Sequence, residues 1–230
     1  MSERVKLTAV DGHELEAYVA HPAGAPRGAV VLVQEIFGIN SHIRGVADGY
    51  AKDGYLVVAP ALFDRFERGL ELQYTGEDSK KAYELYGKLN PEVQMKDVAA
   101  AFEFARKTVG NAIGVIGYCY GGLMSWVTAT RGETLKVQPA CCVCYYPGGI
   151  GKYASEEPSC PVMIHIGADD SHIGPEQVEP VKKAHPEVEV FIYKGADHAF
   201  NRAADPAKYR EAAAKLARER TLEFLRTNVG

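Results

Sequence analysis

The sequence contains no long apolar segment. None of its apolar runs approaches the ~18 consecutive residues that a membrane-spanning helix needs. The first ten residues, MSERVKLTAV, also lack the apolar core of a secretory signal peptide. We therefore expect a cytoplasmic location and no membrane partner.

Positive charge is scarce as well. The chain has 26 Lys and Arg against 30 Asp and Glu, a net charge of −4. A nucleic-acid-binding protein needs a basic patch, so we expect no nucleic acid as a partner. Because the overall charge does not attract anions, an anionic substrate would need an Arg or Lys inside its own pocket.

Cysteine is infrequent and odd in number, with five in the chain. Without an export signal, we interpret these residues as reduced thiols. Cys141, Cys142 and Cys144 lie close together, but neighbouring residues of a strand point to opposite faces, so the three cannot converge on one metal ion. We predict a core strand there, and neither a metal nor another cofactor.

The apolar segments that are present alternate with amphipathic ones. Near-continuous apolar runs predict strands buried on both faces at 28–35, 54–60, 112–119, 139–146, 161–167 and 188–195. Helices are predicted at 41–53, 76–89, 91–108, 120–130, 175–183 and 205–227. Asp11-Gly12 predicts a hairpin turn between two further strands. Together they predict one α/β domain over 1–230, with a mostly parallel, twisted sheet of about eight strands and helices on both faces.

Residues 117–122 read Gly-Tyr-Cys-Tyr-Gly-Gly at a predicted junction of strand and helix. This spacing matches the nucleophile elbow G-x-S-x-G, with Cys119 in place of serine. The glycines allow a sharp turn that lifts the side chain above the sheet, and the positive end of the following helix favours a thiolate. A lone cysteine is usually a core residue, but packing does not require these glycines. Cys119 is therefore the predicted nucleophile.

Two further groups follow Cys119 in the chain, each just beyond a predicted strand. In proteins with this elbow an acid and then a histidine come after the nucleophile, which fits Asp170 and His198. The histidine takes the proton of the thiol, and the carboxylate fixes the histidine's tautomer. Asp169 is interpreted as a turn residue. Asp197 ranks third as the acid, because sequence neighbours rarely point at each other.

An acidic residue, Glu35, ends the first buried strand. The loop after this strand normally provides one N–H of an oxyanion hole, and the residue after the nucleophile provides the other. These are the N–H groups of Ile36 and Tyr120, with Glu35 beside them. Phe37 is a candidate for the wall of a substrate pocket, and so is one of Tyr145 and Tyr146, of which Tyr145 is preferred. Each can equally be a core residue.

Together these segments resemble the dienelactone hydrolase family, the carboxymethylenebutenolidases. The resemblance covers nearly the whole chain and rests on residues 34–38, 117–122, 167–170 and 195–200, with Arg202. It implies an α/β-hydrolase fold and a Cys-His-Asp triad that opens a lactone through a cysteine thioester. It also implies that Glu35 contacts the resting thiol and accepts its proton when substrate binds, while Arg202 holds the substrate's carboxylate.

One position departs from the pattern of that family. Better-known members carry a second carboxylate-binding arginine on the helix before Tyr83, itself an expected substrate contact, whereas this chain has Ser79 there. Cations that could replace that arginine are Lys80, Lys81, Arg65 and Arg68. A lysine would act as a point charge without the planar fork of arginine. We still expect a small ester or lactone that bears a carboxylate.

Two other functions fit part of the pattern. One is a receptor with this fold that binds a small ligand without turnover, and the other is a thiol redox protein that uses Cys119. The complete set of acid, base and nucleophile favours a hydrolase over both, and no C-x-x-C pair supports the redox alternative. His42 and His172 are interpreted as ordinary residues, and the protein as a monomer or small homo-oligomer.

Overall fold

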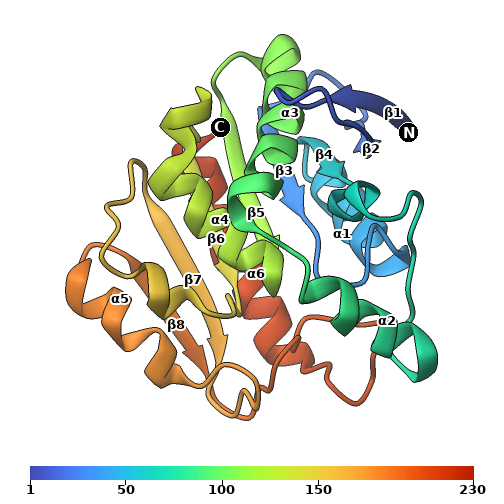
Figure 1. Cartoon of the computed structure of the whole chain (residues 1–230). Coiled ribbons are helices and arrows are strands. Elements are labelled where there is room, and N and C mark those ends of the chain that lie inside the picture. The colour runs from blue at the N-terminus through green and yellow to red at the C-terminus, as the bar shows by residue number, and fades with distance from the viewer.

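The computed structural model describes residues 1–230 and places eight strands in one sheet (Figure 1). The spatial order is β1-β2-β4-β3-β5-β6-β7-β8. β1 and β2 form the predicted hairpin, β2 pairs antiparallel with β4, and the other neighbours are parallel. The strands are β1 (Ser2–Thr8), β2 (Glu14–Ala20), β3 (Ala29–Val33), β4 (Leu56–Pro60), β5 (Ile113–Tyr118), β6 (Cys141–Tyr145), β7 (Val162–Gly167) and β8 (Glu189–Tyr193).

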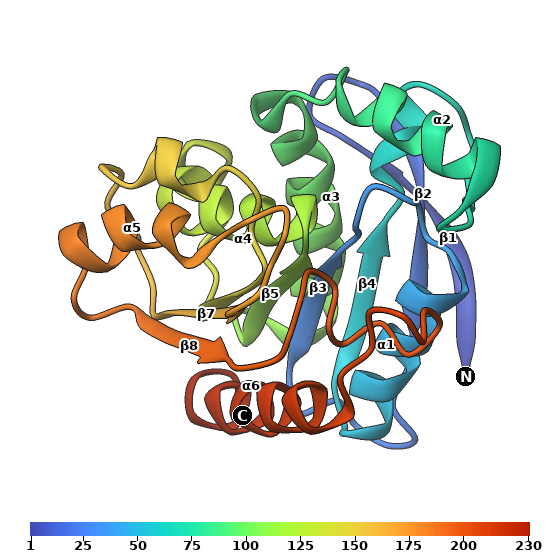
Figure 2. The same cartoon turned by 90° about the horizontal axis from the view of Figure 1, so that it is seen from below.

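Helices cover both faces of this sheet, which confirms the predicted fold class. Figure 2 shows α1 (Ser41–Lys52) and α6 (Glu211–Asn228) on one face, and α3 (Pro91–Val109), α4 (Tyr120–Arg131) and α5 (Glu179–Ala184) on the other. The remaining helix is α2 (Gly76–Tyr86). No helix has both the length and the apolar character needed to cross a bilayer.

Five of the six predicted buried strands are buried because they have helices on both sides. The prediction for 188–195 is wrong, because β8 is the edge strand of the sheet and only its last residue, Tyr193, is buried. Every residue of β3, β4, β5, β6 and β7 is buried. Cys141, Cys142 and Cys144 are free, buried core residues of β6, as predicted. The side chain of Asn40 caps α1 by accepting from the N–H of Ile43, and Asn90 caps α3 in the same way with Pro91 at its first turn.

The last helix was predicted to start at residue 205, and this boundary is wrong. α6 begins at Glu211, and residues 201–210 form turns. The N–H groups of Lys208 and Tyr209 both donate to the carbonyl of Asp205, and the N–H of Arg210 donates back to the carbonyl of Phe200. These bonds hold residues 201–210 as a compact loop, so the regular helix starts only at Glu211.

Candidate active site

The turn that carries Cys119 is a strained junction between β5 and α4. Cys119 has φ 56° and ψ −116°, a left-handed conformation that is unusual for a residue with a side chain. A side chain at Gly117 would collide with the backbone of Gly121, and one at Gly121 would collide with the carbonyl of Val33. Glycine is therefore required at both positions, and the turn presents Cys119 at the carboxyl end of the sheet.

His198 and Asp170 lie together beyond the ends of β8 and β7. Nδ1 of His198 is 2.9 Å from Oδ2 of Asp170. The other oxygen of Asp170 accepts from the N–H groups of His172 and Ile173 at 2.9 and 2.7 Å. These bonds fix the carboxylate, which in turn orients the imidazole and leaves its Nε2 free for chemistry.

Asp197, the third-ranked acid, has a different role. Its carboxylate accepts from the N–H groups of Ser171 and His198 and forms an ion pair with Lys208. Although Asp197 adjoins His198 in sequence, its carboxylate bonds to the backbone of that residue and not to the ring. It therefore braces the loop.

The environment of His198 favours the imidazolium form. Burial by itself lowers the pKa of this histidine, but its interactions with Cys119 and Asp170 outweigh that effect and raise the pKa to about 10. A histidine that binds a proton this strongly can keep the proton of a neighbouring thiol. The site therefore holds a protonated imidazole next to both Asp170 and Cys119.

A buried ion pair joins Glu35 to the loop after His198. Nη2 of Arg202 donates to Oε1 of Glu35 at 2.7 Å, and both side chains are almost fully buried. Burial raises the pKa of Glu35, but the Arg202 guanidinium overcomes this and holds it below its ordinary value. The guanidinium also lies 4.0 Å from the ring centroid of Tyr74.

This pairing differs from what the resemblance implied for the resting protein. The structure contains no hydrogen bond between Glu35 and the thiol of Cys119, because Arg202 holds that carboxylate instead. Oε2 of Glu35 and Nε of Arg202 are buried without hydrogen-bond partners. The pair is therefore charged but only partly satisfied, which leaves bonding capacity for a substrate group.

A pocket of about 360 Å³ contains Cys119 and His198. Of the predicted site residues, Ile36, Phe37, Tyr83 and Arg202 also line it. The N–H of Ile36 makes no hydrogen bond to the rest of the backbone, and Tyr120 begins α4, where an N–H has no acceptor inside the helix. Both amides are thus available to an oxyanion.

The cations proposed to replace the second arginine lie elsewhere. Ser79 lines the pocket, but Lys80 and Lys81 are paired with Glu77 and Glu67 on the outer surface. Arg65 is held by Asp97 and Asp11, and Arg68 donates to the carbonyl of Glu14. None of the four lines the pocket that contains Cys119.

Tyr145 was expected to face the substrate, and the structure does not place it there. Its side chain is fully buried, its hydroxyl bonds to Oγ1 of Thr221 at 2.7 Å, and it faces the side of the sheet covered by α6. Tyr146 follows the end of β6 with a positive φ of 37°, and its hydroxyl donates to Oδ1 of Asn201. The ring of Tyr146 packs 4.8 Å from that of His198.

Several pocket residues were not identified from the sequence. Those with aromatic or charged side chains are Tyr74, Tyr86, His172, Asp205 and Lys208. Asp205 also lies 3.6 Å from the guanidinium of Arg202. The ring of His172 lies edge-on to that of His198, with centroids 5.1 Å apart. None of these residues belongs to a motif. Only the position of His172, two residues after Asp170, could have indicated that it lies near the pocket.

Comparison with known proteins decides the family. A model of the dienelactone hydrolase family matches residues 15–229. The chain is also 31% identical to a carboxymethylenebutenolidase of Pseudomonas putida, over 98% of this chain and 96% of that one. The chain belongs to the dienelactone hydrolase family. A second relative, carboxymethylenebutenolidase 1 of Cupriavidus pinatubonensis, is 29% identical over 98% and 97% of the two chains.

Solved structures agree with this family assignment. A Klebsiella pneumoniae protein provisionally assigned as a dienelactone hydrolase superimposes with a TM-score of 0.82 and 26% identity, over 98% of both chains. A Pyrococcus furiosus esterase shares the fold at 18% identity, with a TM-score of 0.68 over 100% of this chain and 91% of its own. The chain therefore has the predicted α/β-hydrolase fold, and the family supports an ester or lactone hydrolase that acts on a small molecule.

Proposed function

We propose that this dienelactone hydrolase family member cleaves a small, carboxylate-bearing ester or lactone through a thioester on Cys119. The observation that carries this proposal is the 2.9 Å contact between His198 and Asp170 in the pocket that also contains Cys119. Nucleophile, base and orienting acid come from three separate strand ends, which is the arrangement that acyl transfer requires.

In the first half of the reaction the Cys119 sulfur attacks the substrate's carbonyl carbon. The N–H groups of Ile36 and Tyr120 stabilise the resulting oxyanion, and each such donor is typically worth about 10²–10³ in rate. The carbon–oxygen bond then breaks, and the leaving oxygen takes up the proton that Cys119 gave up, which leaves His198 neutral. A thioester remains on Cys119.

In the second half water cleaves the thioester. Neutral His198 takes a proton from the water while the water's oxygen attacks the thioester carbonyl, and Asp170 stabilises the imidazolium that forms. The carbon–sulfur bond breaks, which releases the acid and restores the thiolate. One ester and one water thus give one acid and one alcohol, and no cofactor is required.

The ion pair of Glu35 and Arg202 supports a substrate with a carboxylate. A bound carboxylate competes with Glu35 for the guanidinium, because an arginine fork can hold a carboxylate by two bonds. A buried Glu35 that loses its cation becomes more basic, so it is a second acceptor for the proton of Cys119 besides His198. Lys208 provides a second positive charge on the same pocket wall.

The test is to trap the intermediate by mass spectrometry after mixing with an activated ester such as p-nitrophenyl acetate. We expect an acyl adduct on Cys119 that accumulates in His198→Ala and is absent in Cys119→Ala. Cys160→Ala is the matched control, since Cys160 is the other partly exposed thiol. An adduct that persists in Cys119→Ala would overturn the assignment. Binding of the ester without turnover by the unmodified protein would favour a receptor.

A further inference from the structure

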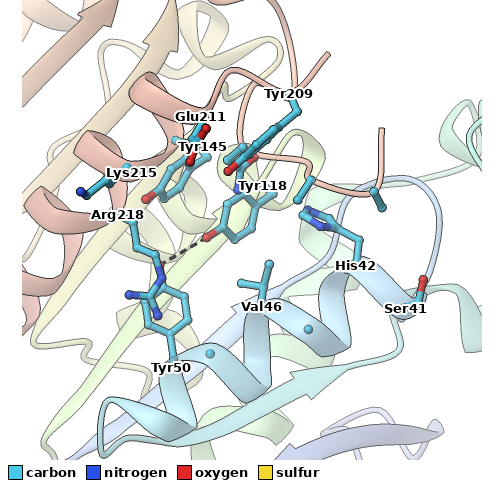
Figure 3. A pocket seen from close by; sticks show the side chains of 16 residues that line it. Ser41, His42, Val46, Tyr50, Tyr118, Tyr145, Tyr209, Glu211, Lys215 and Arg218 are labelled. Atoms are coloured by element: carbon cyan, nitrogen blue, oxygen red, sulfur yellow. Dashed lines mark hydrogen bonds between the residues drawn. The ribbon is translucent and has the colours of Figure 1, made fainter. Parts of the chain in front are cut away.

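A second cavity, of about 600 Å³, lies between α1 and α6 (Figure 3). We call it the α1–α6 cavity. Tyr118 and Tyr145, at the ends of β5 and β6, form its inner wall, and residues of the 201–209 loop form part of its rim. No residue that lines it also lines the pocket of Cys119, so the two cavities are separate.

A glycine inside α1, Gly45, lines the cavity. A Cβ at Gly45 would meet no atom within 4 Å, so neighbouring packing does not require glycine there. Glycine is among the least favourable residues inside a helix. Gly45 is exposed at the rim of the cavity, and a long side chain at this position has room to extend over it.

A polar atom at the cavity lacks a partner. Nε2 of His42 is buried and makes no hydrogen bond, and the residue is only 8% exposed. Figure 3 shows the ring of His42 directed from α1 toward the cavity. A buried polar nitrogen without a partner carries a free-energy cost, which a hydrogen bond from a ligand would remove.

One cation without an ion-pair partner lies at the open side of the cavity. Lys215 on α6 makes no ion pair, whereas Arg218 is paired with Asp53 and lies over the ring of Tyr50. Glu211 is the single carboxylate among the lining residues. The interior is aromatic and aliphatic, with Tyr50, Tyr118, Tyr145 and Val46 around it (Figure 3).

We propose that the α1–α6 cavity binds a small aromatic carboxylate. Its ring would lie between Val46 and the tyrosines, where flat aromatic surfaces suit each other. Its carboxylate would pair with Lys215, whose ammonium is not engaged elsewhere. His42 and the hydroxyl of Tyr118 can provide further hydrogen bonds.

The ligand would also influence the Cys119 pocket, because the two cavities share a wall. In the loop after β8, His198, Arg202 and Lys208 face the Cys119 pocket. Asn201, Ala203, Ala204 and Tyr209 of the same loop face the α1–α6 cavity. A ligand that contacts this second set changes the free energy of the loop positions that hold Arg202. Such coupling is reciprocal and typically changes affinity about 5–150-fold. This coupling rests on the proposed function, whereas binding in the cavity does not.

Titration calorimetry with benzoate tests binding independently of turnover. The protein is first alkylated at Cys119 with iodoacetamide, so that benzoate cannot reach the thiol. We expect Gly45→Leu, which extends a better helix former over the cavity, to weaken benzoate binding at least about tenfold without lowering the thermal midpoint. Lys215→Gln should weaken it several-fold. Arg226→Gln, on α6 but away from the cavity, is the matched control and should bind normally. Benzyl alcohol, which lacks the charge, should bind more weakly than benzoate.

Two results would overturn this site. One is the absence of binding up to about 10 mM benzoate. The other is binding that survives Gly45→Leu and disappears in Arg202→Gln, which would place benzoate in the Cys119 pocket.

The coupling between the two cavities is measured as the KM for a carboxylate-bearing ester with and without benzoate, in unalkylated protein. If benzoate shifts this KM in the unsubstituted protein but not in Gly45→Leu, the coupling is supported. If benzoate leaves the KM of the unsubstituted protein unchanged, the coupling is refuted. Normal benzoate binding by a protein that hydrolyses no ester would sink only the proposed function.

Discussion

The elbow at 117–122 and the loop at 198–210 both bring reactive side chains to the carboxyl end of the sheet, but different forces hold them. The elbow is held by backbone packing, in which Gly117 and Gly121 leave no room for a side chain. The loop is held by charges, because Arg202 pairs with Glu35 and Lys208 pairs with Asp197. The elbow should therefore be sensitive to side-chain size, and the loop to charge.

The largest expected effect comes from the buried pair of the loop. Arg202→Leu leaves Glu35 as an unpaired buried carboxylate, and we expect the free energy of unfolding to fall by about 3–5 kcal/mol in urea denaturation. The double variant Glu35→Leu/Arg202→Leu should recover most of this loss. Arg226→Leu, which breaks an exposed pair with Glu223, should cost less than about 1 kcal/mol. Equal losses of stability in Arg202→Leu and Arg226→Leu would show that the loop does not depend on the buried charge.

The elbow should fail by overpacking. Gly121→Ala places a methyl group against the carbonyl of Val33, and we expect a loss of about 3 kcal/mol in the free energy of unfolding, together with loss of activity. Gly87→Ala is the matched control, because a Cβ there makes only ordinary contacts, and it should change stability by less than about 1 kcal/mol. If the two variants were equally stable, the elbow would not be held by packing.

The pH dependence of stability should link the two regions. The folded pKa of His198 is about 10, above its ordinary value of 6.5. The stability this histidine provides is therefore fully present below 6.5 and is lost as the pH rises through 10. The stability difference between the unsubstituted protein and His198→Gln should shrink across this range, by at most ~1.4 kcal/mol per pH unit. Cys119→Ala removes the thiol that helps to raise this pKa, so it should flatten the profile. If the pH dependence of stability of Cys119→Ala were identical to that of the unsubstituted protein, this would argue against contact between the elbow and the loop.

The smallest expected effect is that of Lys208, whose side chain is about one-third exposed. Lys208→Met removes a positive charge from the pocket wall, and we expect KM to rise a few-fold for an ester that bears a carboxylate. KM for a neutral ester should stay the same. Lys80→Met, outside the pocket, should change neither value. An equal rise for both esters would mean that Lys208 only braces the loop through Asp197.

The accuracy of the sequence predictions follows the same division. The elbow and the buried strands are local patterns, since glycine spacing and apolar runs follow directly from backbone sterics and burial. The start of α6 was predicted too early because turn bonds of residues 205–210, which no periodicity reports, override the helical pattern. The orientation of Tyr145 was undecidable from its position alone, because adjacent strand residues face opposite sides.

The sequence by itself determined the strand-to-helix turn at Cys119, the chain order of Cys119, Asp170 and His198, and the family resemblance. Only the tertiary structure decided that Arg202 is held by Glu35, 167 residues away, and that Lys208 and His172 join the same pocket. Local geometry depends on a few neighbouring residues and can be read from them. Ion pairs and pocket walls depend on how distant segments pack, and sequence spacing does not record that.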